Sequence, residues 1–244
     1  MNVSAPIIAF DEIDSTNAEA RRRAEDGEMG PLWFTAAHQT AGRGRRGRVW
    51  DTSVGNLAAT YLFTTPKPPG EAAQISFVAA LAVADLAARF VPSDMVTLKW
   101  PNDTLIAGRK TAGILVESGP ARGSGLWIAV GIGVNLAHAP EGLPPPAVPP
   151  TFLGNHGAIP SPSEALDVLS AAFERRLRLW ELEGFTAVAA AWTLRAHGLG
   201  ASCVARLPHE TVEGVAEGLD ADGALRLRTS DGAVRRITAG DVFF

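Results

Sequence analysis

Residues 39–50, with the sequence QTAGRGRRGRVW, carry the side chains of this chain that are best suited to chemistry. Three glycines and four arginines occupy residues 42–48. Glycine lets a backbone turn sharply and approach a ligand, and arginine presents a fork of donors that matches carboxylate and phosphate oxygens. Trp50 adds a flat face on which a base can stack. The segment predicts an anion-binding loop, although a solvated basic loop or an arginine-glycine RNA-binding tract fits it equally well.

A second polar segment, KWPND at residues 99–103, is followed by a strand-like stretch that begins near Lys110. Pro-Asn-Asp and Gly108 are good turn chemistry, so two strands joined by a turn explain most of this pattern. They do not explain Lys110. A lysine at the start of an otherwise apolar strand places a compact positive charge where carboxylate and phosphate oxygens can bind.

Two shorter motifs have both a structural and a functional interpretation. Ser-Thr-Asn at residues 15–17 favours a helix N-cap, and the same groups also suit a small polar ligand. Residues 131–135, GIGVN, predict a strand whose glycines form a bulge or let a ligand lie against the backbone. A dinucleotide fingerprint is rejected, because the third glycine and the following helix are missing.

The elements that must position these residues alternate along the chain. We predict strands at residues 7–10, 32–38, 56–63, 96–100, 104–106, 111–117 and 126–135, and helices at 18–25, 71–90, 162–180 and 185–196. Gly27 ends the first helix and Ser161 caps the third. The proline-rich residues 139–150 predict a surface loop over the sheet. The expected fold class is α/β (α+β), with a mixed, largely antiparallel sheet and packed helices.

From about residue 201 the pattern changes to short strands. Asp-Gly pairs at residues 222–223 and 231–232 are typical of hairpin turns. We expect a small β-barrel that leans on the preceding domain, because so short a segment buries little core of its own. The predicted domains are residues 1–197 and 198–244.

Composition excludes several classes of protein. The chain has 244 residues, of which 46% are hydrophobic, so it can bury a sizeable core. Its 22 basic and 26 acidic residues give a net charge of −4, which argues against a general nucleic-acid or membrane-surface binder. Cys203 is the single cysteine, so no internal disulfide forms. No signal peptide and no apolar run of roughly 18 residues is apparent, and we expect a cytoplasmic protein.

In this order and spacing, residues 15–17, 39–50, 99–103, 108–115 and 131–135, with the small C-terminal barrel, resemble biotin protein ligases. The resemblance covers nearly the whole chain. It implies a class II synthetase-like biotin/lipoate ligase catalytic domain followed by an SH3-like domain. No helix-turn-helix segment precedes Ile7, so the chain is similar to the short form that lacks an N-terminal DNA-binding domain.

The resemblance also implies an ATP-dependent, AMP-forming reaction in two steps. Biotin's carboxylate attacks the α-phosphate of ATP to give biotinyl-5′-adenylate and pyrophosphate. A lysine of a biotin carboxyl carrier protein, from acetyl-CoA carboxylase or a related carboxylase, then attacks the mixed anhydride. Mg²⁺ arrives with ATP, and the histidines show no spacing for a resident metal. Neither nucleic acid nor membrane is an expected partner, and a homodimer is left open.

Site residues follow from the matching motifs. Implied catalytic residues are Lys110, Arg45, Arg48 and Asp103, of which Asp103 is the candidate for helping to deprotonate the carrier lysine. Implied biotin-binding residues are Ser15, Thr16, Asn17, Gln39, Gly42, Arg43, Gly44, Arg45, Lys110, Gly113 and Ile114, with Gly131 and Ile132 in the pocket wall. Implied ATP or adenylate contacts are Arg43, Arg45, Arg48, Trp50, Asn102, Lys110 and Asn135.

Three alternatives stay open. A lipoate or octanoate ligase or transferase of the same fold would need a long, narrow acyl channel in place of a polar ring pocket. An RNA-binding protein would explain the arginines, but the net charge and the lack of interleaved aromatic residues speak against it. A catalytically silent carrier-binding protein would not need Lys110. Residues 150–153, PTFL, depart from the small-Thr-Ser-Leu run that relatives often carry, so contacts from that connection are left open.

Overall fold

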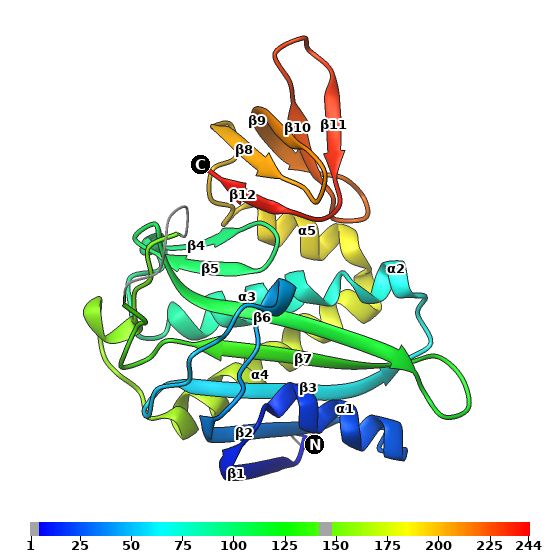
Figure 1. Ribbon diagram of the computed structural model, residues 1–244, viewed down its shortest axis with the longest axis vertical. Helices are drawn as coiled ribbons and strands as arrows, with labels where there is room; N and C mark the ends of the chain where they lie inside the picture. Colours follow the sequence, from blue (N-terminus) through cyan, green and yellow to red (C-terminus); the bar gives the residue numbers. More distant parts are fainter. Residues whose placement is uncertain (1–4, 142–147) are drawn as a thin grey trace.

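The computed structural model describes residues 5–141 and 148–244. Its centre is a seven-stranded sheet in the order β1-β2-β3-β7-β6-β5-β4 (Figure 1). The β1 and β2 strands pair in parallel and the other neighbouring strands pair antiparallel, which confirms the predicted mixed sheet. The strands are β1 (Ile7–Ile13), β2 (Leu32–Gln39), β3 (Leu57–Thr65), β4 (Val96–Lys99), β5 (Asp103–Ile106), β6 (Arg109–Pro120) and β7 (Leu126–Val134).

Helices cover both faces of this sheet, because successive strand residues point to opposite sides. In β2, Trp33 belongs to one apolar cluster, and its neighbours Leu32 and Phe34 belong to the other. Helix α1 (Thr16–Asp26) packs on the face of Leu32 and Phe34. Helices α3 (Ile75–Ala87) and α4 (Pro162–Glu183) pack on the opposite face, and α5 (Phe185–Thr193) lies beside them (Figure 1).

The predicted helix caps are confirmed. Ser15 accepts a hydrogen bond from the Ala18 backbone N–H, and Gly27 ends α1 in the left-handed conformation at φ 106°. At α4, Ser161 accepts from the Glu164 backbone N–H. These helix ends are specified by local sequence. A short polar side chain accepts a hydrogen bond from a free backbone N–H at the start of a helix, and a glycine adopts the left-handed conformation that ends one.

The single helix predicted at residues 71–90 is wrong. The chain forms α2 (Pro69–Ala72), a turn at residues 73–74, and then α3. Ala73 and Gln74 keep right-handed helical backbone angles, so an alanine-rich pattern does not reveal the break. Gln74 is buried, and its Oε1 accepts a hydrogen bond of 3.0 Å from Trp180 Nε1 of α4.

The segment Pro69–Ala87 is also long and apolar enough to cross a membrane, contrary to the prediction that no such segment exists. Most of it is buried inside the protein against the sheet and its neighbouring helices. Its apolar character is therefore that of a core helix.

The last part of the chain forms a five-stranded antiparallel sheet in the order β11-β10-β9-β8-β12. Gly223 and Gly232 adopt positive φ at the two predicted hairpin turns. As expected, this sheet leans on the rest of the molecule. Trp100 Nε1 donates a hydrogen bond of 3.0 Å to Gly223 O, and one apolar cluster spans both parts. The strands are β8 (Ser202–Arg206), β9 (Thr211–Leu219), β10 (Leu225–Arg228), β11 (Val234–Ile237) and β12 (Asp241–Phe243).

Candidate active site

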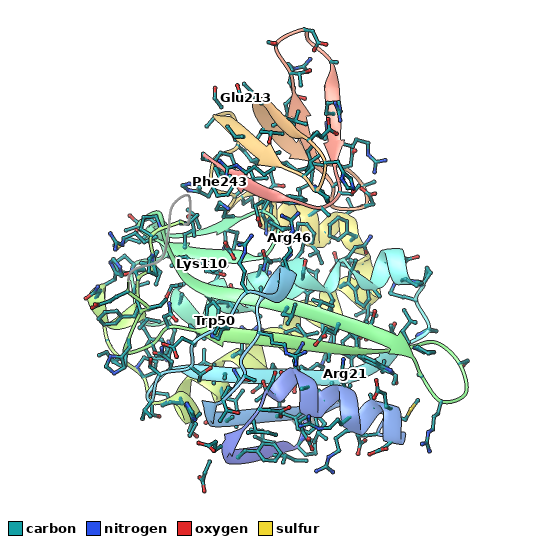
Figure 2. All side chains as sticks on the ribbon, in the orientation of Figure 1. Arg21, Arg46, Trp50, Lys110, Glu213 and Phe243 are labelled. Carbon is teal, nitrogen blue, oxygen red and sulfur yellow. The ribbon has the colours of Figure 1, made fainter. Side chains whose placement is uncertain are left out.

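A cavity of about 750 Å³ opens between the α1 side of the central sheet and the C-terminal sheet. Trp50 and Lys110 lie on this side of the molecule, with Phe243 of the C-terminal sheet facing the same space (Figure 2). Every predicted site residue except Gly42 lines the cavity: Ser15, Thr16, Asn17, Gln39, Arg43, Gly44, Arg45, Arg48, Trp50, Asn102, Asp103, Lys110, Gly113, Ile114 and Asn135. Segments far apart in the chain thus meet at one place.

One wall of the cavity is polar and uncharged, and it comes from the start of α1 and the end of β2. The Thr16 backbone N–H donates to Gln39 Oε1 at 2.8 Å, and Thr16 Oγ1 lies 3.1 Å from the same oxygen. Gln39 Nε2 donates to Thr52 Oγ1 at 2.9 Å, which orients the amide. Ser15, Thr16 and Asn17 are all at least 95% buried. Such fixed donors and acceptors suit a small polar ring.

The opposite end of the cavity is charged. Lys110 Nζ lies 2.6 Å from Asp103 Oδ1, across the β5–β6 turn. Arg45 Nη1 donates to Asn102 Oδ1 at 3.0 Å, and burial lowers the pKa of the Arg45 guanidinium. The Asn102 amide in turn donates to Ile114 O at 2.8 Å. Cations held in a partly buried pocket favour the binding of a phosphate or carboxylate group.

The arginine loop at residues 42–48 folds back on itself. The Gly44 N–H donates to Arg48 O at 2.7 Å, and the Trp50 N–H donates to Gly42 O at 3.0 Å. A Cβ at Gly42 would lie 2.3 Å from Trp50 O, so this glycine permits the close approach and does not line the cavity. Gly42 therefore shapes the loop, and its contact with biotin stays a prediction.

The loop also rests on the C-terminal sheet. Arg46 and Arg48 both pair with the Asp241 carboxylate of β12. Arg45 Nη2 reaches Gly240 O at 3.4 Å. Together with Arg206 and Phe243, Asp241 lines the same cavity, so the C-terminal sheet forms part of the site.

Trp50 lies on a shelf made by two glycines. A Cβ at Gly133 would lie 2.3 Å from Trp50 Nε1 and Cε2, and one at Gly113 would lie 3.1 Å from Cζ3. Lys110 Nζ is 5.7 Å from the centroid of the indole ring. The glycines of β6 and β7 therefore let the Trp50 ring lie against these strands. The sequence of residues 131–135 predicted such room, but for a ligand.

Asn135 has a structural partner. Its Nδ2 donates to Thr151 O at 3.0 Å, and the Thr151 N–H donates to Lys110 O at 2.8 Å. This pairing joins the end of β7 to the segment after the proline-rich connection. Of the predicted loop at 139–150, residues 142–147 lie outside the described residues.

Several cavity residues were not predicted. Lys99 is only 7% exposed; burial lowers its pKa, and the nearby Asp103 carboxylate opposes that effect. The argument used for Lys110, a lysine in an apolar strand, applies equally to Lys99 and would have found it. No signal of this kind exists for Arg206, Asp241 and Phe243, whose side chains reach the cavity only through the packing of the two sheets.

Comparisons with known proteins agree with this arrangement. Residues 9–135 match the biotin/lipoate A/B protein ligase family, and residues 198–244 match the biotin protein ligase C-terminal domain. A biotin acetyl-CoA-carboxylase ligase of Paracoccus denitrificans is 44% identical over 235 residues, which cover 95% of this chain and 97% of the relative. The bifunctional ligase/repressor BirA of Bacillus subtilis is 30% identical over 97% of this chain and 73% of its own length.

A solved structure of similar fold is that of the biotin protein ligase from Aquifex aeolicus in complex with biotin and ATP. Its TM-score is 0.79 at 25% identity, and the match covers 98% of this chain and 97% of that chain.

Proposed function

The chain belongs to the biotin protein ligase family, and from this premise we propose that it activates biotin as biotinyl-5′-adenylate with ATP and transfers the biotin to a carrier lysine. The observation that carries the proposal is a single cavity that joins an uncharged hydrogen-bonding wall to a group of cations. Biotin has the matching form, since a polar ureido ring stands at one end of a short apolar chain and a carboxylate stands at the other.

The polar wall is the proposed site of the ureido ring. Ser15 Oγ accepts from the Ala18 N–H, which leaves its hydroxyl proton for the ureido carbonyl. Gln39 Nε2 donates one proton to Thr52 and has a second to offer. Trp50 and Leu115 line the cavity beside the glycines of β6 and β7 and provide apolar surface for the aliphatic chain.

The charged end is the proposed site of the triphosphate. Lys110, Lys99, Arg45 and Arg48 line the cavity, and we propose that the biotin carboxylate and the α-phosphate meet beside them. The carboxylate oxygen attacks phosphorus, and the bond to pyrophosphate breaks. No general base is needed, because the carboxylate is already ionised. Positioned cations, with Mg²⁺ bound to the incoming ATP, stabilise the charge that develops.

Asp103 is the proposed helper in the transfer step. The carrier lysine must lose a proton as its amine attacks the anhydride carbon and AMP leaves. Asp103 lies beside Lys110 in the cavity and offers a carboxylate at the reacting end. The proposed acceptor is a biotin carboxyl carrier protein or domain. Three further points stay predictions: the boundary between the two domains at residues 197 and 198, a homodimer, and a cytoplasmic location.

Gly133→Ala is expected to raise the KM for ATP by about 10-fold, the order of one lost stacking contact. We propose that the adenine of ATP stacks on Trp50. The new Cβ would occupy the place of the Trp50 ring, which must then leave its position against the two glycines. Steady-state pyrophosphate release measures the effect. Gly70→Ala is the matched control, because nothing lies within 4 Å of a Cβ there. Equal KM values for the two variants would contradict the placement of adenine at Trp50.

The proposal is tested by incubating the full chain with Mg-ATP and biotin, lipoate or octanoate in separate reactions. We expect biotinyl-adenylate by mass spectrometry, and labelling of an apo carrier domain when one is added. Lipoyl- or octanoyl-adenylate without biotinyl-adenylate would assign the chain to the alternative acyl substrates. Absence of all three adenylates would overturn the proposal.

A further inference from the structure

Lys110 is held at its backbone by a segment that follows the proline-rich connection. Its N–H donates to Pro149 O at 2.9 Å, and its carbonyl accepts from the Thr151 N–H at 2.8 Å. Residues 149–151 thus pair in parallel with the start of β6, on the side where β7 has already ended at Val134. Both backbone groups of a lysine that lines the cavity are therefore fixed by residues distant in the chain (Figure 2).

The pairing of β6 with β5 is irregular at the same place. Lys110 is the partner of Leu105, whereas the next partners along the two strands are Ala112 and Thr104. One residue of β6 is therefore extra, and such a bulge changes the direction of the side chains beside it. A bulged strand end is held less firmly by its regular neighbour. The direction of the Lys110 side chain consequently depends on residues 149–151 as well as on β5.

Thr151 anchors this segment through three different groups. Its N–H donates to Lys110 O, and its carbonyl accepts a hydrogen bond of 3.0 Å from Asn135 Nδ2. Its hydroxyl oxygen lies 2.9 Å from His156 Nε2. The residue is 2% exposed, so these bonds are shielded from water. Of the three groups, the hydroxyl is the one that a substitution removes without changing the backbone.

We propose that Thr151 is a positioning residue for Lys110. Held at its hydroxyl by His156, Thr151 fixes the bulged end of β6 and so places the ammonium group for the adenylation step. Thr151 is not among the described residues that line the cavity, so it acts through Lys110. A displacement of about 1 Å at a reacting group costs about 100-fold in rate, so a smaller shift is measurable. The inference rests on the proposed function and deepens it.

Thr151→Val removes the hydroxyl and keeps the shape of the side chain. We expect the single-turnover rate of biotinyl-adenylate formation to fall about 10-fold, because Lys110 is no longer held in place. The Kd for biotin by calorimetry should stay within about twofold, since the polar wall is untouched. Thr151→Ser keeps the hydroxyl and should react within about twofold of the wild type.

Thr65→Val is the matched control and should leave the rate unchanged. Thr65 is a buried threonine at the end of β3, and its hydroxyl accepts a hydrogen bond of 3.3 Å from the Lys67 N–H. It is not among the described residues that line the cavity. The control therefore removes a buried, bonded hydroxyl without touching the end of β6.

A double-mutant cycle separates the positioning of Lys110 from general damage. Thr151→Val is combined with Lys110→Ala, and the rate of the double variant is compared with that of Lys110→Ala alone. If Thr151 acts through Lys110, the added substitution should lower the rate by less than about twofold, because the group that it positions is gone. A merely structural role would cost about the same factor in both backgrounds.

The outcomes separate this inference from the proposed function. Absence of biotinyl-adenylate in the wild type would overturn the proposed function and the inference with it. If the wild type forms the adenylate, an unchanged rate in folded Thr151→Val would overturn the positioning role alone, and so would a loss that persists without Lys110. Should Thr151→Val not fold, His156→Ala removes the same bond from a half-buried side chain, and the same rates decide.

Discussion

Lys110→Ala is expected to lower the rate of biotinyl-adenylate formation by about 1,000-fold, the upper order for loss of one positioned charge at a reacting phosphoryl group. Lys110 Nζ lies 2.6 Å from Asp103 and lines the cavity at its charged end. The side chain is 27% exposed, so its removal opens no hole in the core. Single-turnover formation of the adenylate, followed by mass spectrometry, measures the loss.

Lys110→Arg should also lower the rate of biotinyl-adenylate formation, by about 100-fold, because a planar guanidinium does not replace a compact ammonium group. The matched control is Lys67→Ala, which removes a lysine paired with Glu71 away from the cavity. We expect all three variants to fold as the wild type does. Near-normal adenylate formation by folded Lys110→Ala would remove this residue from the chemical step.

Arg45→Gly is expected to release the adenylate rather than to prevent its synthesis. Arg45 ties the arginine loop to Asn102 and to Gly240 O. Two hydrogen bonds of about 1 kcal/mol each correspond to more than about 10-fold in retention of the intermediate. Lys110 and Lys99 remain in the cavity to stabilise the phosphoryl charge. Biotin label on an unrelated lysine-rich protein should therefore increase about 10-fold, while adenylate yield changes less.

Arg46→Gly provides the comparison on the same loop. Arg46 does not line the cavity and already has a positive φ of 57°, which glycine adopts readily. Asp241 keeps its other partner, Arg48, when Arg46 is removed. The labelling of bystander protein should change little in this variant. Loss of adenylate synthesis in Arg45→Gly, without bystander label, would place Arg45 in the chemical step.

Much of this protein follows from its sequence, because the signals concerned are local. A polar N-cap before α1, a glycine after it and Asp-Gly pairs in the C-terminal sheet each act on backbone groups a few residues away. The alternation of apolar residues identified most strands, and the arginine-glycine loop and KWPND marked the charged end of the site. The motifs in their order indicated the family, which the comparisons then showed.

Other features depend on contacts between segments that are distant in the sequence, and only the tertiary structure revealed them. The break at Gln74 leaves helical backbone angles and is anchored by Trp180, 106 positions away. Asp241 holds the arginine loop from β12, and Glu117 orients Asn17 from β6. A carboxylate in an exposed strand and one behind a pocket look alike in a sequence. Whether such a carboxylate accepts a hydrogen bond from a buried side chain depends on the strand order, on the register and on the face of the sheet that its side chain occupies.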